Sequence, residues 1–216
     1  MRKRVFERTF TRSHCHQRPG YYRSFQQVLI YAQLTRLVYD WHMQTVVPIE
    51  VLPYDPAWPL HYEAARQDIL NAIGTFVTRI EHIGSTAVPG LAAKPVIDIL
   101  VGVRSLADAP AFLPLLYPLG YAYQPEHEDV LPERRYLHRI VDGAHTHHLH
   151  IVEVQSEFFR VQLLFRDFLR LHPEAALRYA ALKLRLAQQY RLDREAYTDG
   201  KSAFIAEILV QASHGN

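Results

Sequence analysis

The chain is poor in cysteine and contains no long apolar run. Cys15 is the one cysteine in 216 residues. No disulfide can therefore form within the chain, and zinc sites built from C-x-x-C pairs are excluded. A single cysteine favours a reducing compartment, so a cytoplasmic location is expected. No stretch approaches eighteen uninterrupted apolar residues, so no transmembrane helix is predicted.

Charge is distributed unevenly along the chain. The formal net charge is +2, with 24 Lys and Arg against 22 Asp and Glu. Residues 1–42 contain eight of the basic residues and two of the acidic ones, so this segment carries +6 and the remainder carries −4. A basic segment thus precedes a mildly acidic domain. Contents of 49% hydrophobic and 21% charged residues predict a packed core for the chain as a whole.

Residues 1–42 have three interpretations, which the sequence leaves open. The segment is a basic arm for nucleic acid or an anionic surface, an organelle-targeting peptide, or sequence ahead of a start at Met43. Apolar spacing within 25–41 favours a helix there, and disorder is the alternative. A secretory signal is not indicated, because no apolar block directly follows the arginine-rich part. We predict a single domain at residues 43–216.

Strand-like and helix-like patterns are interspersed in the first part of this domain, and helical patterns fill its last part. The expected strands are 46–52, 77–83, 95–103, 136–141 and 147–154, and the expected helices are 60–73, one from Ser105 to before Gly120, 157–171, 174–190 and 198–212. Asp142-Gly143 predicts a hairpin turn, and Thr198 is the expected cap of the last helix. The order predicts an α+β or mixed α/β fold in which helices partly cover one sheet.

A carboxylate interrupts an apolar strand pattern in the stretch 81–103, EHIGSTAVPGLAAKPVIDILVGV. Asp98 stands within the apolar run 96–101, and twelve residues separate it from Gly84-Ser85. A buried carboxylate normally has a partner, so one interpretation is an Asp98 that only accepts structural hydrogen bonds. The other is functional. Amides at a glycine turn bind phosphate oxygens, and a strand acid facing the turn binds the metal that bridges them. Lys94 is then either a phosphate contact or a solvated lysine.

The stretch HIGSTAVPGLAAKPVIDILVGV resembles the signature of the GrpB family, part of the nucleotidyltransferase superfamily. Further blocks that resemble the family are YDPAW (54–58), GY (120–121), HLHIVE (148–153), LFRDFLRLHPE (164–174), YAALKLRLA (179–187) and YTDGKSAFIAEIL (197–209). The resemblance covers about residues 46–211. It implies a nucleotidyltransferase-like mixed β-sheet flanked by helices, with a helical C-terminal part. The first 42 residues match nothing in the family.

The resemblance also implies roles for individual residues. Gly84 and Ser85 are expected to contact the phosphates of a nucleotide, and Asp98 is expected to be the first of two or three acids that hold two metal ions. With Ser85, Asp98 is the candidate catalytic residue. The second acid of the superfamily pattern falls at Leu100, and a leucine cannot bind Mg²⁺. Two-metal catalysis in its usual form is therefore not expected from this chain.

Two histidines are candidates to compensate for the missing acid. The period of a strand places His148 and His150 on one face and Glu153 on the other. Together with Asp98 they make a candidate site for a divalent metal, with Zn²⁺ or Mn²⁺ suited better than Mg²⁺. The alternative is a polar rim, or a hydrogen-bond partner for Asp98.

Basic residues in the C-terminal helices are the remaining candidates. Arg166, Arg170 and Lys201 are expected phosphate contacts, with Lys183 and Tyr197 as further candidates. Basic residues on a helix are usually solvated, which is the alternative for each of them.

Three functions are consistent with these patterns. The first is a nucleotidyltransferase-like enzyme that binds a nucleotide or another phosphorylated small molecule and transfers a nucleoside monophosphate to an acceptor. The second is a nucleotide-binding or regulatory module without catalysis. The third is a metal-dependent hydrolase that uses Asp98, His148 and His150. A membrane partner is not expected, and nucleic acid is expected only through the basic arm.

Overall fold

The structure is a computed structural model that describes residues 48–214. The interpretations of residues 1–42, including the helix within 25–41, lie outside the described residues. Between 48 and 214 no helix is both long and apolar enough to cross a bilayer.

Five strands form one mixed sheet in the order β1-β2-β5-β4-β3. The strands are β1 (Val77–Ile83), β2 (Ile97–Val103), β3 (Tyr121–Tyr123), β4 (Arg134–Val141) and β5 (Ala144–Glu153). Strands β2 and β5 are parallel and the other neighbours are antiparallel. The β4–β5 hairpin turns at Asp142-Gly143, where both residues have positive φ, as the sequence predicted.

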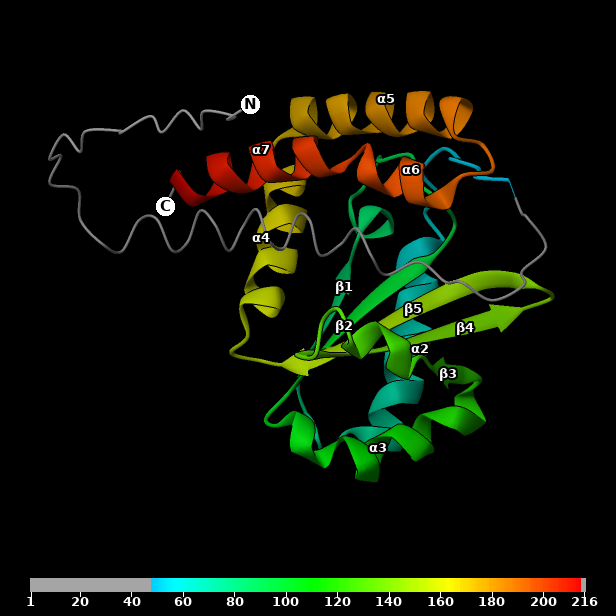
Figure 1. The fold of residues 1–216 in the computed structure, drawn as a ribbon, viewed down its shortest axis with the longest axis vertical. Coiled ribbons are helices and arrows are strands. Elements are labelled where there is room, and N and C mark those ends of the chain that lie inside the picture. Colours follow the sequence, from blue (N-terminus) through cyan, green and yellow to red (C-terminus); the bar gives the residue numbers. More distant parts are fainter. Residues whose placement is uncertain (1–47, 215–216) are drawn as a thin grey trace, which may run out of the picture.

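Helices flank this sheet on both sides (Figure 1). They are α2 (Trp58–Ile73), α3 (Ala109–Leu116), α4 (Glu157–Leu171), α5 (Pro173–Gln189), α6 (Arg194–Asp199) and α7 (Ser202–His214). Helices α5, α6 and α7 lie together on one side of the sheet, and α3 lies on the other (Figure 1). The predicted α+β class, with a helical C-terminal part, is confirmed.

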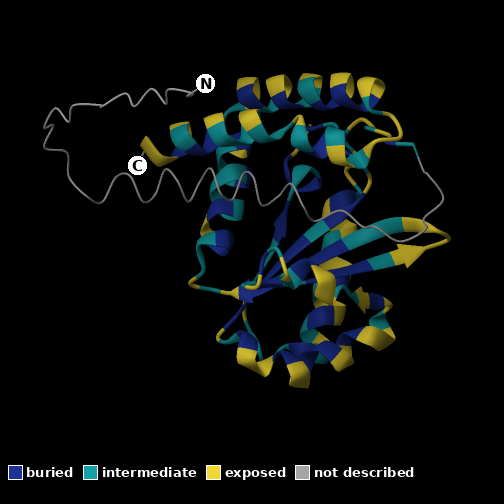
Figure 2. Cartoon of the chain, viewed as in Figure 1, coloured by how far each residue is buried: buried dark blue, intermediate teal, exposed yellow. Residues whose placement is uncertain are grey.

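The main core lies between the sheet and helices α2 and α3. Alternate residues of β2, Ile97, Ile99 and Val101, pack there against Ile69 of α2 and Phe112 of α3. The strands are largely buried, whereas the outer faces of the helices are exposed (Figure 2). Because successive side chains of a strand point to opposite faces, Asp98 and Leu100 lie on the face of the sheet away from this core.

On that opposite face, α4 packs over the sheet and the other C-terminal helices hold the loop after β1. Leu100 lies in an apolar cluster with Phe158 and Phe159 of α4. Val88 and Leu91, from the loop, are buried against residues of α4, α5 and α7. The loop that begins at Gly84 is thus clamped between the sheet and the C-terminal helices.

Two expected elements differ from the prediction. The expected strand 46–52 is reduced, within the described residues, to one isolated bridge between Leu52 and Ala93. The single helix expected at 198–212 is two helices, α6 and α7. Thr198 is buried inside α6, whose cap is Asp193, accepting from the Ala196 amide at 2.9 Å. Helix α6 ends at Gly200, and close packing against Leu186 explains why this position is a glycine, since a Cβ would overlap that side chain.

Candidate functional site

Asp98 and His148 form a hydrogen-bonded pair on the sheet face opposite α2. They are partners in the parallel register of β2 and β5, so both side chains leave the sheet on the same side. His148 Nδ1 lies 3.0 Å from Asp98 Oδ1, and the Asp98 side chain is 27% exposed. Burial would raise the pKa of Asp98, but the hydrogen bond from His148 and the charge of nearby imidazoles hold it below the usual value. The carboxylate is therefore ionised and partly accessible.

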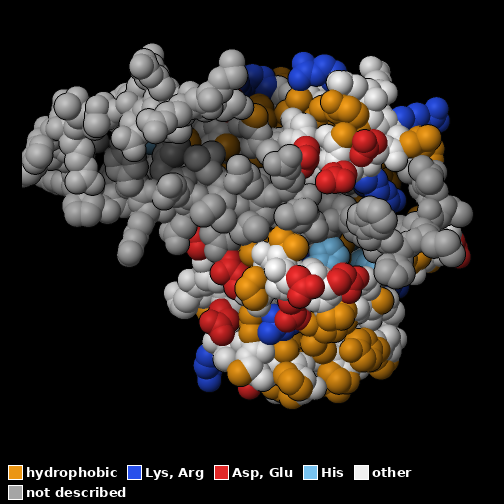
Figure 3. All heavy atoms as spheres, viewed as in Figure 1, with side chains coloured by type: hydrophobic (Ala, Val, Ile, Leu, Met, Phe, Trp, Pro, Cys, Tyr) orange, Lys and Arg blue, Asp and Glu red, His pale blue; other side chains and the backbone are white. Residues whose placement is uncertain are grey.

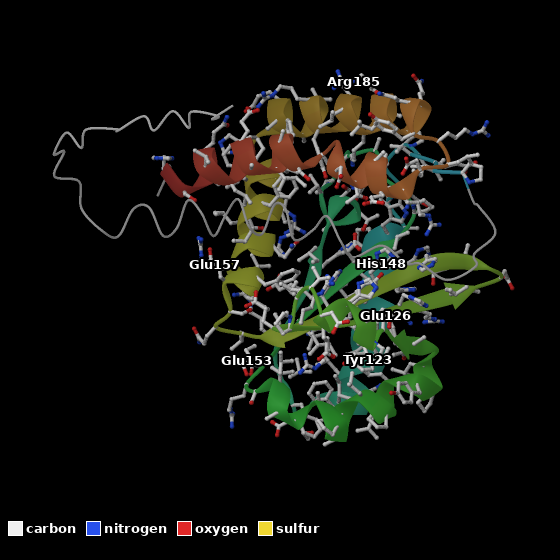
Figure 4. All side chains as sticks on the ribbon, viewed as in Figure 1. Tyr123, Glu126, His148, Glu153, Glu157 and Arg185 are labelled. Atoms are coloured by element: carbon white, nitrogen blue, oxygen red, sulfur yellow. The ribbon has the colours of Figure 1, made fainter. Side chains whose placement is uncertain are left out.

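His148 lies near the middle of the molecule, whereas Glu153 lies at the far end of the same strand (Figure 4). Glu153 accepts a hydrogen bond from the Leu106 amide at 3.1 Å, so it caps the turn before α3. The predicted separation of Glu153 from the histidines is confirmed.

Gly84 brings the backbone directly against the Asp98 carboxylate. Its φ is +70°, and a Cβ at this position would overlap Asp98 Oδ2. Ser85 follows at the start of a 3₁₀ turn, Ser85–Ala87, and is half-buried. The predicted proximity of the glycine-serine bend and the strand acid is confirmed, while the role of both in phosphate binding stays a prediction.

A matched pair of glycine substitutions tests this close approach. Gly84→Ala should lower the stability by about 2 kcal/mol or slightly more, because left-handed strain adds to the overlap with Asp98. Gly90→Ala is the control, since Gly90 has φ +78° in the same loop and nothing within 4 Å of a Cβ. Gly90→Ala should lower the stability only by the strain of a left-handed backbone, about 1 kcal/mol. Urea denaturation measures both, and equal losses would contradict a tight Gly84–Asp98 contact.

A buried hydrogen-bond chain fixes the bend between β1 and β2. His82 Nε2 lies 3.0 Å from Thr86 Oγ1, and the Thr86 hydroxyl donates to the Val96 carbonyl at 3.1 Å. Tyr62 stacks on the His82 ring with centroids 4.6 Å apart. Burial lowers the pKa of His82 to about 4, so the ring is neutral at pH 7. His82 thus has a structural place at the end of β1.

Three lysines from separate segments interact electrostatically with Asp98. Lys94 precedes β2, Lys183 lies on α5, and Lys201 lies between α6 and α7. Each of them is attracted electrostatically by Asp98. Lys183 is 2% exposed, and its Nζ donates to the Ala92 carbonyl. Lys94 and Lys201 are half-buried.

Burial and mutual repulsion lower the pKa of all three lysines. Burial, then repulsion from Lys201, lowers the pKa of Lys183 to about 7. Burial lowers the pKa of Lys94 to about 8, with a contribution from Arg194, and that of Lys201 to about 8, with a contribution from Lys94. The one carboxylate of Asp98 opposes these shifts without cancelling them. The site is thus a concentration of positive charge that an anion would stabilise.

The sequence interpretation took each lysine singly and missed their shared interaction with Asp98. Position along the chain does not bring 94, 183 and 201 together, because they meet only when the C-terminal helices pack over the sheet. One signal was present in the composition. The chain has 20 arginines but only four lysines, and three of those four are at this site.

Arg166 is held by protein partners on β1 and on its own helix. Its guanidinium is 6% exposed and donates to Glu81 Oε2 at 2.6 Å, to Asp167 Oδ1 at 2.7 Å and to the His82 carbonyl at 2.9 Å. These contacts tie α4 to β1 and give Arg166 a structural place, while its role as a phosphate contact stays a prediction. Arg170 is 39% exposed and donates to the Ala87 carbonyl at 2.9 Å. It therefore reaches the end of the Ser85–Ala87 turn.

A cluster of histidine and aromatic side chains continues from His148 along β4 and β5. His150 Nδ1 lies 3.2 Å from Arg134 Nη1, and the pKa of His150 is well below its usual value because of burial and the Arg134 charge. Tyr136 contacts both histidines, with centroids 5.7 Å from His148 and 5.3 Å from His150. Histidines reach the surface near the middle of the molecule (Figure 3).

The comparisons with known proteins agree with the sequence blocks. The family model described as "GrpB protein" matches residues 48–211. This chain belongs to the GrpB family. A UPF0157 protein from Pseudomonas aeruginosa is 43% identical over 168 residues, which cover 76% of this chain and 67% of that protein. The crystal structure of the conserved protein GrpB from Enterococcus faecalis matches with a TM-score of 0.71 and 35% identity, covering 77% of this chain and 98% of that one.

A more distant match is terminal uridylyl transferase 4 from Trypanosoma brucei with bound CTP. It is 14% identical, with a TM-score of 0.45, and covers 88% of this GrpB-family chain and 57% of that chain. A score of that size does not establish a shared activity.

The donor set of this GrpB-family protein does not fit a two-metal site. Leu100, at the expected second acid, is completely buried among apolar side chains. Asp98 Oδ1 is bonded to His148, and Oδ2 lies against Gly84. His150 faces Arg134 instead of completing a ligand set. Within 48–214, no three His, Cys, Asp or Glu side chains are arranged to hold a metal ion.

A separate hollow of about 890 Å³ lies between α4 and α7. Its lining includes Phe159, Leu163 and Phe168 of α4 and Gln211 of α7. None of the predicted site residues lines it, so it is distinct from the site around Asp98.

Proposed function

We propose that this protein binds a nucleotide through its phosphate groups at the site formed by Gly84, Ser85, Asp98 and the three lysines. One observation carries the proposal. Asp98 lies against the glycine-serine bend, and its carboxylate attracts each of the three lysines of the described chain electrostatically. Phosphate oxygens accept hydrogen bonds from ammonium groups and from amides at a glycine turn. The family's nucleotidyltransferase signature, carried here by 82–103, agrees with this chemistry.

A second candidate function is nucleotidyl transfer, favoured by the Asp98–His148 pair. In this step an acceptor hydroxyl oxygen bonds to the α-phosphorus of a nucleoside triphosphate, and the bond from that phosphorus to the bridging oxygen breaks. Pyrophosphate leaves, with its charge facing the lysines. The proton of the hydroxyl passes to the His148 imidazole, and Asp98 stabilises the resulting imidazolium. Leu100 favours binding alone, because the second acid of the superfamily is missing.

The hydrolase that would use Asp98, His148 and His150 together is the weakest of the three functions. His150 is engaged with Arg134, and the three side chains do not form a ligand set.

Thermal denaturation of the full chain with ATP, GTP, CTP and coenzyme A tests nucleotide binding. A ligand at 100 times its Kd stabilises the native state by about 2.7 kcal/mol. For a chain of this size the melting temperature should then rise by roughly 5–10 °C. Pyrophosphate release with a mixture of hydroxyl acceptors would add transfer to binding. No shift with any of these ligands at millimolar concentration would refute the proposed function.

A further inference from the structure

Among the residues that the structure describes, the lysines around Asp98 bring more positive charge to the site than this one carboxylate balances. Lys183 and Lys201 repel each other, and so do Lys201 and Lys94. Arg194 adds to the repulsion at Lys94. Among these groups Asp98 contributes one negative charge. Like charges held in a half-buried place destabilise a fold, and lysines whose pKa is lowered in this way are candidates for a functional site.

The three lysines are buried to different extents. Lys94 and Lys201 are half-buried, and Lys201 Nζ lies 4.5 Å from the centroid of the Tyr197 ring. Lys183 is 2% exposed and lies beneath, bonded to the Ala92 carbonyl. A buried ammonium acts through a less polarisable medium than water, so its field at the ligand is weakly screened. Lysine suits this use because it binds phosphate as a compact point charge.

A superfamily site of the usual kind neutralises the triphosphate with metal ions held by two or three acids. Here Leu100 occupies the second acid position inside an apolar cluster, and His148 occupies one oxygen of the first acid. The protein therefore offers a single carboxylate and three ammonium groups where a metal-binding site needs several carboxylates.

We propose that the site takes a polyphosphate chain, as in a nucleoside di- or triphosphate, whose charge is neutralised by Lys94, Lys183 and Lys201, so that binding requires no divalent metal ion. The inference rests on the proposed function and specifies how the same site holds its ligand. Asp98 is then not a metal ligand. It limits the repulsion among the lysines in the free protein and positions His148.

Calorimetric titration of the full chain with tripolyphosphate and with ATP, first in EDTA and then in Mg²⁺ or Mn²⁺, tests this. Binding should be present in EDTA, and Mg²⁺ or Mn²⁺ should leave it unchanged or weaken it, because a metal ion on the phosphate oxygens competes with the ammonium groups for them. Lys201→Met and Lys94→Met should each weaken binding by about tenfold, because each removes one charged contact. Arg185→Met is the control. It removes an exposed charge from the same helix as Lys183 and should leave Kd unchanged.

Asp98→Asn distinguishes phosphate binding by the lysines from phosphate binding through a metal ion on Asp98. If lysines hold the ligand, this variant should keep its affinity in EDTA or bind more tightly, since a negative charge has been removed. If Asp98 holds a metal ion, the variant should lose binding. Binding that appears only with metal and disappears in Asp98→Asn would overturn the inference while leaving the proposed function intact. Binding in EDTA that survives both lysine substitutions would also overturn it. No binding in either condition would refute the proposed function itself.

Discussion

Arg166→Met should lower the free energy of unfolding by about 2–4 kcal/mol and the melting temperature by roughly 5–15 °C. The substitution keeps the apolar stem and removes a guanidinium that is 6% exposed. Glu81, whose side chain is 20% exposed, would keep only its 2.7 Å contact with Arg79, and the His82 carbonyl would lose its donor. Burial raises the pKa of Glu81 and the two arginines lower it more, which shows how far the carboxylate depends on them.

Arg160→Met is the matched control on the same helix. Arg160 pairs with Glu157 at the surface, at i,i+3, and its side chain is 53% exposed. Such pairs contribute a few tenths of a kcal/mol, so the loss should stay below about 0.5 kcal/mol. Thermal and urea denaturation of both variants give the comparison. Similar losses for the two would mean that the contact between α4 and β1 does not anchor the helix.

The consequence of the Arg166 contact extends to the candidate site. Arg166 bonds to the carbonyl of His82, two residues before Gly84, and Arg170 bonds to the carbonyl of Ala87, three residues after it. Helix α4 therefore holds both ends of the glycine-serine bend. Arg166→Met should weaken nucleotide binding as well as stability, through the position of the bend.

Local sequence signals predicted most of the elements that position the site. The partial alternation in 77–83, the apolar run in 95–103, the Asp142-Gly143 turn and the proline at 173 each act over a few residues, so their structural consequences can be inferred from the sequence alone. The short strand β3 was missed, because Tyr121–Tyr123 is too short to show a period and is a strand only through its pairing with β4. The division of 198–212 at Gly200, where α6 ends, was also missed.

The site was predictable in part. The pairing of Asp98 with one of the two histidines was among the alternatives, and the structure selects His148, which is its neighbour in the parallel register. The period of a strand places His148 and His150 on the same face. It therefore could not predict that the two histidines have different hydrogen-bond partners. What separates them is Arg134, which β4 brings to His150 and which no pattern in 145–153 reveals. Likewise, the helical spacing of Arg166 and Arg170 does not show which of them is buried.

Lys183→Met should remove much of the rise in stability expected for the protein between pH 7 and pH 9.5. The pKa of Lys183 is about 7 in the folded protein and near 10.5 in the unfolded chain, so over this range the unfolded chain binds more protons at this position. Stability therefore increases with pH, by roughly 3 kcal/mol from this lysine alone. Lys94 and Lys201, with pKa values of about 8, act in the same direction. Tyr62, with a pKa raised to about 12, opposes them only above the ordinary tyrosine range.

Urea midpoints at intervals of half a pH unit measure this slope, with Arg185→Met as the control on the same helix. Arginine stays charged throughout, so the control should keep the slope of the unmodified protein. The absolute stability of Lys183→Met is less informative, because the lost bond to the Ala92 carbonyl opposes the gain from no longer burying an ammonium group. An unchanged slope in Lys183→Met would mean that this ammonium group is well solvated in the folded protein. In that case burial and repulsion from Lys201 would not lower the pKa of Lys183, and the charges near Asp98 would destabilise the fold less than the shift to about 7 indicates.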